Sequence, residues 1–306
     1  MINYIKEFLS YLEVERNLAG NTISSYENDL LQFHNYLVSL FKKNDYNINE
    51  IDQKIIRNYL RHLLVNNIKK VSIGRKAAAI RSYFRFLSKR KYIQKNPSSN
   101  IISPKAEKKL PVFVDEKSIE KMMKLPDPEI ITGLRDLAIL ELFYGSGIRE
   151  SELLELNLSG LNLSKNIMKV FGKGSKERIV PVGSRAAEVL SEYLKRRNEL
   201  FSKETDENDK KTVFLTNHGK KFYRTGIYNI VKFYLSKAFG GDKCSPHVLR
   251  HTFATHLLDR GADIESVKQM LGHSSLSTTQ IYTHVSVDYL KKIYNKAHPK
   301  ADIDTE

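Results

Sequence analysis

The most informative cluster of reactive side chains is His247, Arg250 and His251, which follow Ser245 and Pro246. Ser and Pro at these places favour the first turn of a helix, where residues three positions apart share a face. Arginine supplies permanently charged, bidentate donors and histidine can move a proton near neutral pH, so the pair suits a phosphate. Two alternatives stay open. One is zinc binding by the two histidines, which no further ligand set supports, and the other is a purely structural role.

Two further cations, Arg149 and Lys173, stand beside glycines. Gly145 and Gly147 let the chain turn tightly and expose Arg149 at the start of a helix. Lys173 lies between glycines at the tip of a predicted hairpin, where its default interpretation is a solvent-exposed lysine and the alternative is a lysine that swings into a cleft. Neither glycine pattern fits a dinucleotide fingerprint or a Walker loop.

Downstream, His273 follows a glycine at a predicted helix junction, and Tyr282 comes nine residues later. Ser277 and Gln280 match a capping box, which predicts a short helix that carries Tyr282. The chain has 16 tyrosines, so Tyr282 considered alone is a packing residue, and only its neighbours suggest chemistry.

The elements that must position these residues differ between the two parts of the chain. Apolar residues at helical spacing predict helices near 3–17 and 52–66, and stripes at 23–40 and 73–87 predict two more. Prolines and short polar residues predict a linker at 96–111. Beyond it we expect helices and a small sheet, with a hairpin formed by 167–171 and 178–182, a helix at 184–200, a mobile charged loop at 202–211, and helices that end at Gly261 and Gly272. The fold class is therefore mainly α with a small β-sheet, divided into a helical domain at 1–95, the linker, and an α+β domain at 112–306.

The charge of the chain predicts a polyanionic partner. The formal net charge is +15, and residues 53–106 carry 14 Lys and Arg but no Asp or Glu. Six of these cations fall off the apolar stripe of the helix near 73–87 and are expected to bind phosphates: Arg75, Lys76, Arg81, Arg85, Lys89 and Arg90. Cys244 is the only cysteine, and neither a secretory signal nor a membrane-spanning run is evident, so a cytoplasmic protein is expected.

The reactive residues, in chain order, are Arg149, Lys173, His247, Arg250, His273 and Tyr282. As a set they resemble the active-site signature of the tyrosine recombinases, the phage integrase family. The likeness runs from about residue 3 to about residue 300 and is strongest to the Xer recombinases of bacteria. It implies an N-terminal SAM-like core-binding domain and a recombinase catalytic domain. Within the Xer branch, 144–147 and 297–300 resemble the XerC group and 245–249 the XerD group, with XerC favoured.

The resemblance implies a role for each residue. Tyr282 corresponds to the nucleophile that forms a 3′-phosphotyrosine, and Arg149 and Arg250 correspond to clamps on the non-bridging oxygens. His273 corresponds to a third phosphate donor, and Lys173 to the acid that protonates the leaving 5′-oxygen.

Two positions have supporting roles in the family. His247 matches the position that helps move the tyrosine proton, and Glu152 matches an acidic position that steadies the site. No metal and no cofactor are expected, because guanidinium groups supply the positive charge and the phosphotyrosine stores the bond energy.

The implied partner is double-stranded DNA, bound by a tetramer that could include a second Xer recombinase. The segment around Val287, Leu290, Ile293 and Tyr294 is expected to form an amphipathic helix. Docking of this helix on a neighbouring protomer is favoured over packing on its own domain. The implied role is resolution of chromosome dimers at cell division. The alternatives are a mobile-element integrase, a type IB topoisomerase-like strand transferase, a DNA-binding protein without catalysis and a metal-dependent nuclease.

Overall fold

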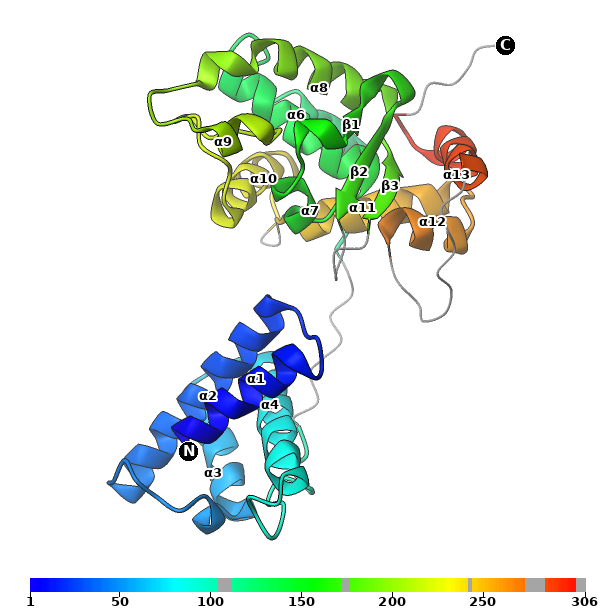
Figure 1. Ribbon diagram of the computed structural model, residues 1–306. Coiled ribbons are helices and arrows are strands. Elements are labelled where there is room, and N and C mark those ends of the chain that lie inside the picture. The colour runs from blue at the N-terminus through cyan, green and yellow to red at the C-terminus, as the bar shows by residue number, and fades with distance from the viewer. Residues whose placement is uncertain (104–111, 172–176, 242–243, 273–283, 301–306) are drawn as a thin grey trace. The chain divides into compact units, whose positions relative to one another are not determined.

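The computed structural model describes residues 1–103, 112–171, 177–241, 244–272 and 284–300. The chain divides into two compact units, Met1–Lys109 and Leu110–Glu306, each with its own hydrophobic core (Figure 1). The expected boundaries of the domains and of the linker at 96–111 stay predictions, because residues 104–111 lie outside the described residues. Within the described part of the chain, none of the helices combines the length and apolar character that a membrane span requires.

The first unit is built from four helices, as its apolar periodicity predicts. They are α1 (Ile2–Val14), α2 (Gly20–Phe41), α3 (Gln53–Val65) and α4 (Lys70–Lys89). Asp52 caps α3 by accepting a hydrogen bond from the backbone N–H of Ile55, which satisfies a donor of the first turn. Aromatic rings fill the core. The ring centroids of Phe8 and Tyr83 are 5.5 Å apart, and those of Phe33 and Tyr59 are 5.0 Å apart.

One of the six expected phosphate-binding cations is instead a core residue. Lys76 is only 5% exposed, and its ammonium group donates to Asp29 at 2.8 Å and to Gln32 at 2.7 Å. The expectation that all six cations lie off the core-facing stripe is therefore wrong for Lys76. The physical reason is a buried carboxylate on α2 that needs a cation, and Arg75 binds that same carboxylate at 2.5 Å.

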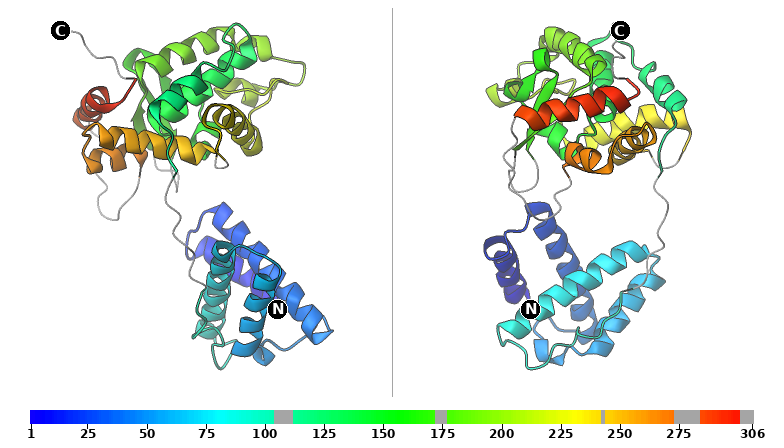
Figure 2. Two further views of the ribbon diagram at one scale, coloured as in Figure 1. Left: turned by 180° about the vertical axis from the view of Figure 1, so that it is seen from behind. Right: turned by 90° about the vertical axis from the view of Figure 1, so that its right-hand side faces the viewer.

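The second unit surrounds a central helix. This helix, α6 (Ile131–Ser146), is buried over most of its circumference and packs against α8 (Ser184–Arg196) and α11 (Pro246–Asp259) (Figure 2). Around it lie α5 (Glu116–Met123), α7 (Glu150–Leu154) and α10 (Arg224–Phe239). The helix expected at 184–200 is confirmed, with its last four residues in a 3₁₀ turn.

A three-stranded antiparallel sheet completes this unit. Its strands are β1 (Leu161–Asn162), β2 (Ile167–Phe171) and β3 (Glu177–Pro181), in the order β1-β2-β3. Ile167 pairs with Pro181 and Phe171 with Glu177, so the predicted hairpin is confirmed with its second strand one residue earlier. The expectation of a mobile charged loop at 202–211 is wrong for the second half of that segment. It contains α9 (Glu207–Lys211), which begins with a capping box between Asp206 and Asp209.

The C-terminal helices form a third hydrophobic cluster in the same unit. α12 (Ile264–Leu271) begins after the capping residue Asp263 and ends at Gly272, as expected. α13 (His284–Ala297) packs against β3, α11 and α12, and it buries Leu290 and Tyr294 among the side chains of that cluster. In this single chain the helix therefore packs on its own unit, which was the less favoured alternative.

Candidate active site

Arg149 lies at the junction between α6 and α7, and a glycine allows the chain to turn there. Gly147 ends α6 with φ of +59°, and a Cβ at this position would lie 2.5 Å from the ring of Phe253. Both the conformation and the space therefore require glycine. The chain then turns so that Arg149 is the N-cap of α7, with its side chain 31% exposed.

The guanidinium of Arg149 is held at both terminal nitrogens. One nitrogen donates to Oε1 of Glu152 at 2.7 Å, and the other donates to the carbonyl oxygen of Gly272 at 2.8 Å. Glu152 also accepts a hydrogen bond from the backbone N–H of Arg149 at 2.8 Å, which satisfies a donor at the start of α7. This arginine is thus oriented before any ligand binds.

Arg250 lies on α11 and is only 8% exposed. Its terminal nitrogens donate to the carbonyl oxygens of Gly147 and Leu271, so it joins the ends of α6 and α12. Burial and the nearby charge of Arg149 lower the pKa of Arg250 to about 9. Each terminal nitrogen carries a second N–H, which can face an anion.

Arg178 is a further cation of this cluster that our sequence reasoning did not single out. It lies on β3, is 6% exposed, and its two terminal nitrogens donate to the two carboxylate oxygens of Glu152. Burial alone would raise the pKa of Glu152, but the hydrogen bonds and charges of Arg178 and Arg149 lower it to about 2. Two guanidinium groups thus bind one carboxylate, and Arg250 lies close enough to feel its charge, which leaves an excess of positive charge suited to an anion.

The structure brings Arg149, Glu152 and Arg250 together, and it places His247 on the same helix as Arg250. His247 is exposed in the first turn of α11. Further along the same helix, Thr252 is buried and accepts a hydrogen bond from the backbone N–H of Val114, which fixes α11 to the start of the unit.

Three predicted site residues lie outside the described residues: Lys173, His273 and Tyr282. Residues that flank two of these segments are described. Phe171 and Glu177 pair at the end of the hairpin that contains residue 173. Gly272, which precedes residue 273, accepts a hydrogen bond from Arg149.

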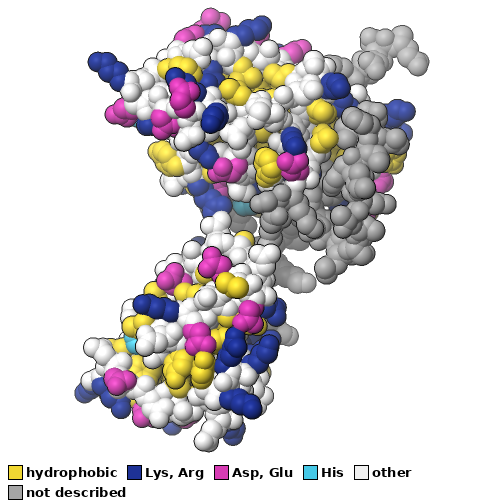
Figure 3. All heavy atoms as spheres, viewed as in Figure 1, with side chains coloured by type: hydrophobic (Ala, Val, Ile, Leu, Met, Phe, Trp, Pro, Cys, Tyr) yellow, Lys and Arg dark blue, Asp and Glu magenta, His cyan; other side chains and the backbone are white. Residues whose placement is uncertain are grey.

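The remaining expected phosphate-binding cations, on α4 and at its C-cap, differ in their surroundings. Arg81 donates to the carbonyl oxygen of Ile101 at 2.9 Å, and Arg90 pairs with Glu15 at 2.5 Å. Arg85 and Lys89 are exposed. Figure 3 shows several Lys and Arg side chains on the right-hand part of the first unit, with others at its left and lower edges and acidic side chains among them.

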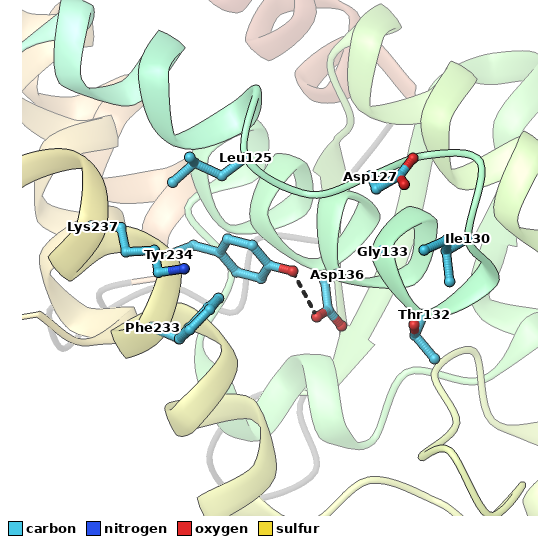
Figure 4. Close-up of a pocket in the computed structure, with 9 residues that line it drawn as sticks. All are labelled: Leu125, Asp127, Ile130, Thr132, Gly133, Asp136, Phe233, Tyr234 and Lys237. Atoms are coloured by element: carbon cyan, nitrogen blue, oxygen red, sulfur yellow. Dashed lines mark hydrogen bonds between the residues drawn. The ribbon is translucent and has the colours of Figure 1, made fainter.

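A surface pocket of about 310 Å³ lies elsewhere in the second unit, between the start of α6 and α10 (Figure 4). Asp136 projects into it and accepts a hydrogen bond from the hydroxyl of Tyr234 at 3.2 Å. Burial raises the pKa of Asp136 even though Arg135 lies beside it. The residues that line the pocket include none of the cationic cluster, so we assign the pocket no part in the candidate site.

Comparison with protein families gives two matches that together cover most of the chain. The model described as "Phage integrase family" matches residues 112–288, and the model described as "Phage integrase, N-terminal SAM-like domain" matches residues 5–91. The two matches therefore fall in the two units of the structure.

Curated relatives are similar over nearly the whole length. The chain is 41% identical over 304 residues to tyrosine recombinase XerC of Pelotomaculum thermopropionicum, covering 98% of this chain and 99% of the relative. It is 40% identical over 301 residues to tyrosine recombinase XerD of Staphylococcus epidermidis, covering 98% and 100%.

Solved structures share the fold. The XerH site-specific recombinase bound to palindromic difH substrate has a TM-score of 0.67 at 24% identity, covering 94% of this chain and 83% of that one. The Tn1549 transposon integrase in complex with a circular intermediate DNA has a TM-score of 0.69 at 16% identity, covering 94% and 98%.

Proposed function

This chain belongs to the phage integrase family, as a tyrosine recombinase of the Xer type, and on that premise we propose that Tyr282 is its nucleophile. The observation that carries the proposal is the preorganised pair Arg149 and Arg250. Both are tied to the backbone at residues 271–272, directly before the segment that contains Tyr282. A nucleophile supplied from that segment would approach a phosphate bound by this pair.

The reaction begins when the phenol oxygen of Tyr282 forms a bond to the scissile phosphorus. The bond from that phosphorus to the 5′-oxygen breaks, and the DNA is left attached through its 3′-phosphate. Negative charge grows on the non-bridging oxygens during the attack. Arg149 and Arg250 stabilise this charge, and the loss of one such donor typically costs about 2.7–4 kcal/mol of transition-state stabilisation.

Two proton transfers accompany this step. The proton of the phenol must leave, because an ordinary tyrosine with a pKa near 10 is mostly protonated at neutral pH. We assign this transfer to His247, which lies one helical turn from Arg250. Lys173 protonates the leaving 5′-oxygen, and His273 gives a further hydrogen bond to the phosphate. A 5′-hydroxyl then attacks the phosphotyrosine and reverses each transfer, so no external energy source is required.

The DNA partner is supported by two observations. XerH and the Tn1549 integrase share this fold and their structures hold DNA. The first unit also carries the exposed cations Arg85 and Lys89 on α4. We assign these two side chains, together with the partly engaged Arg75, Arg81 and Arg90, to the phosphates of the duplex.

The cellular role follows from the Xer relatives and is the finer part of the proposal. We propose resolution of chromosome dimers at cell division, in the cytoplasm, by a tetramer on DNA that could include a second Xer recombinase. Relatives named XerC and XerD are almost equally similar, at 41% and 40% identity. The XerC assignment therefore rests on the segments at 144–147 and 297–300. Sequencing of genomic fragments trapped on the protein would identify its site.

A Tyr282→Phe variant tests the central chemistry. The variant should bind duplex DNA as the parent does and should form no covalent adduct. An adduct of undiminished yield would refute the assignment. Relaxation of a supercoiled plasmid without recombination sites would instead favour the topoisomerase-like alternative.

A further inference from the structure

Arg178 is a buried cation that the proposed mechanism does not use. It lies on β3, and its fork-shaped guanidinium matches both oxygens of Glu152, with the second nitrogen 2.8 Å from Oε2. Such bidentate pairs fix geometry as well as supply energy. Both terminal nitrogens of Arg178 are paired with a carboxylate, whereas those of Arg250 donate only to backbone carbonyls, so we assign Arg178 no direct contact with the DNA.

The carboxylate that Arg178 grips is the one that orients Arg149. Oε1 of Glu152 accepts from the guanidinium of Arg149 at 2.7 Å, and Oε2 accepts from the backbone N–H of Arg149 at 2.8 Å. Both oxygens are therefore shared between the two arginines. A shift of the carboxylate would move the side chain of Arg149 and the start of α7 together.

Arg178 also touches the second anchor of Arg149. A Cβ at Gly272 would lie 2.8 Å from Nε and 2.9 Å from Cζ of Arg178, so the glycine backbone packs directly on the guanidinium. The carbonyl oxygen of Gly272 accepts from Arg149 at 2.8 Å. Arg178 thus contacts both groups to which the guanidinium of Arg149 is bonded.

We propose that Arg178 is a positioning residue for strand cleavage, which holds Arg149 in place through Glu152 and Gly272. The inference rests on the proposed function, in which Arg149 binds the scissile phosphate. β3 directly follows the segment that contains Lys173. Through Glu152, Arg178 therefore also connects the base of that hairpin to Arg149.

The charges around Glu152 give the proposal a distinctive pH signature. Three cations face this carboxylate: Arg149 from the N-cap of α7, Arg178 from β3 and Arg250 from α11. Without Arg178, the carboxylate keeps its burial but loses its strongest partner, so its pKa rises. Protonation at mildly acidic pH would then weaken the hold on Arg149, and cleavage would become sensitive to acid.

The test uses the full chain and single-turnover cleavage of a nicked duplex that traps the covalent adduct. Arg178→Met should cleave about 10²-fold more slowly, because a misplacement near 1 Å costs roughly that much. DNA binding should be unchanged, and Arg178→Lys should retain part of the rate. Between about pH 8 and about pH 5, the Arg178→Met rate should fall more steeply than the parent rate. Arg185→Met, which removes an exposed cation on α8, is the matched control.

A double variant, Arg178→Met with Glu152→Gln, keeps the test valid if the single variant loses its fold. It contains no unpaired buried carboxylate, so it should cleave slowly and show no added acid sensitivity. Cleavage by Arg178→Met or by the folded double variant at the Arg185→Met rate would overturn the inference. So would a rate loss matched by equal loss of DNA binding. Failure of the parent protein to form any adduct would instead overturn the proposed function.

Discussion

Replacing Glu152 with glutamine should destabilise the second unit even before DNA is involved. The carboxylate is 3% exposed and accepts hydrogen bonds from Arg178, from the guanidinium of Arg149 and from the backbone of Arg149. Glutamine preserves the shape of the side chain and removes its charge. The remaining cations, Arg149, Arg178 and Arg250, would then face one another without a counter-charge.

The magnitude follows from the pKa of Glu152, which falls from 4.5 to about 2 in the folded protein. Because one pKa unit corresponds to 1.36 kcal/mol, the fold favours the ionised side chain by about 3 kcal/mol. A lowered folded pKa means that this contribution is present above pH 4.5 and is lost as the pH falls towards about 2. The difference between parent and variant should therefore be largest near neutrality and should shrink in acid.

Calorimetric melting of the full chain measures this effect. The transition of the second unit should move down by about 6–12 °C in Glu152→Gln, on the scale of about 2–4 °C per kcal/mol for a unit of this size. Glu155→Gln is the matched control, because Glu155 is exposed and pairs with Lys221 at 2.7 Å on the surface. A melting temperature equal to that of the control, or a difference that persists undiminished into acid, would refute the reasoning.

Three further predictions concern other parts of the chain. Lys76→Met should destabilise the first unit by about 3 kcal/mol in urea denaturation, because the buried Asp29 loses one of its cationic partners. A variant as stable as the parent would contradict the buried ion pair. The pKa of His298 lies near 3 because of burial, below its ordinary value, so the unfolded chain binds the proton more tightly. From about pH 7.5 to about pH 5.5, stability should fall by about 1.4 kcal/mol more in the parent than in His298→Gln, and equal slopes would contradict the prediction. Arg250→Lys cannot bridge two carbonyl oxygens as the guanidinium does, so adduct formation should slow by about 10²–10³-fold, and an unchanged rate would exclude Arg250 as a clamp.

Much of the helical framework could be predicted because it depends on local signals. Pro246 at the first turn of α11, the cap Asp263 and the terminal Gly272 all act within a few residues of the boundary that they set. The hairpin could be predicted for the same reason, since its two strands are neighbours in sequence.

The partner of Lys76 could not be predicted in this way. Asp29 lies on a different helix, 47 residues away, and nothing in the local pattern of α4 marks Lys76 as the cation that will be buried. The six basic residues of α4 look alike in sequence, and only the packing of α2 against α4 separates them.

The pattern of β3 could have identified Arg178 as a buried residue. Residues 178 and 180 share the buried face of β3, so an arginine stands where the strand alternation calls for an apolar residue. A charged residue at an inward-facing position requires a buried partner of opposite charge. Glu152 is such a partner, but its distance of 26 residues along the chain hides the pairing until the fold is known.

The most direct test of the central claim is to identify the atom that carries the DNA. The full-length protein would be trapped on a nicked recombination site, digested with protease and nuclease, and its nucleotide-linked peptide sequenced by mass spectrometry. We expect a single linkage, between the phenol oxygen of Tyr282 and a 3′-phosphate. A linkage to another residue, or to a 5′-phosphate, would contradict the account.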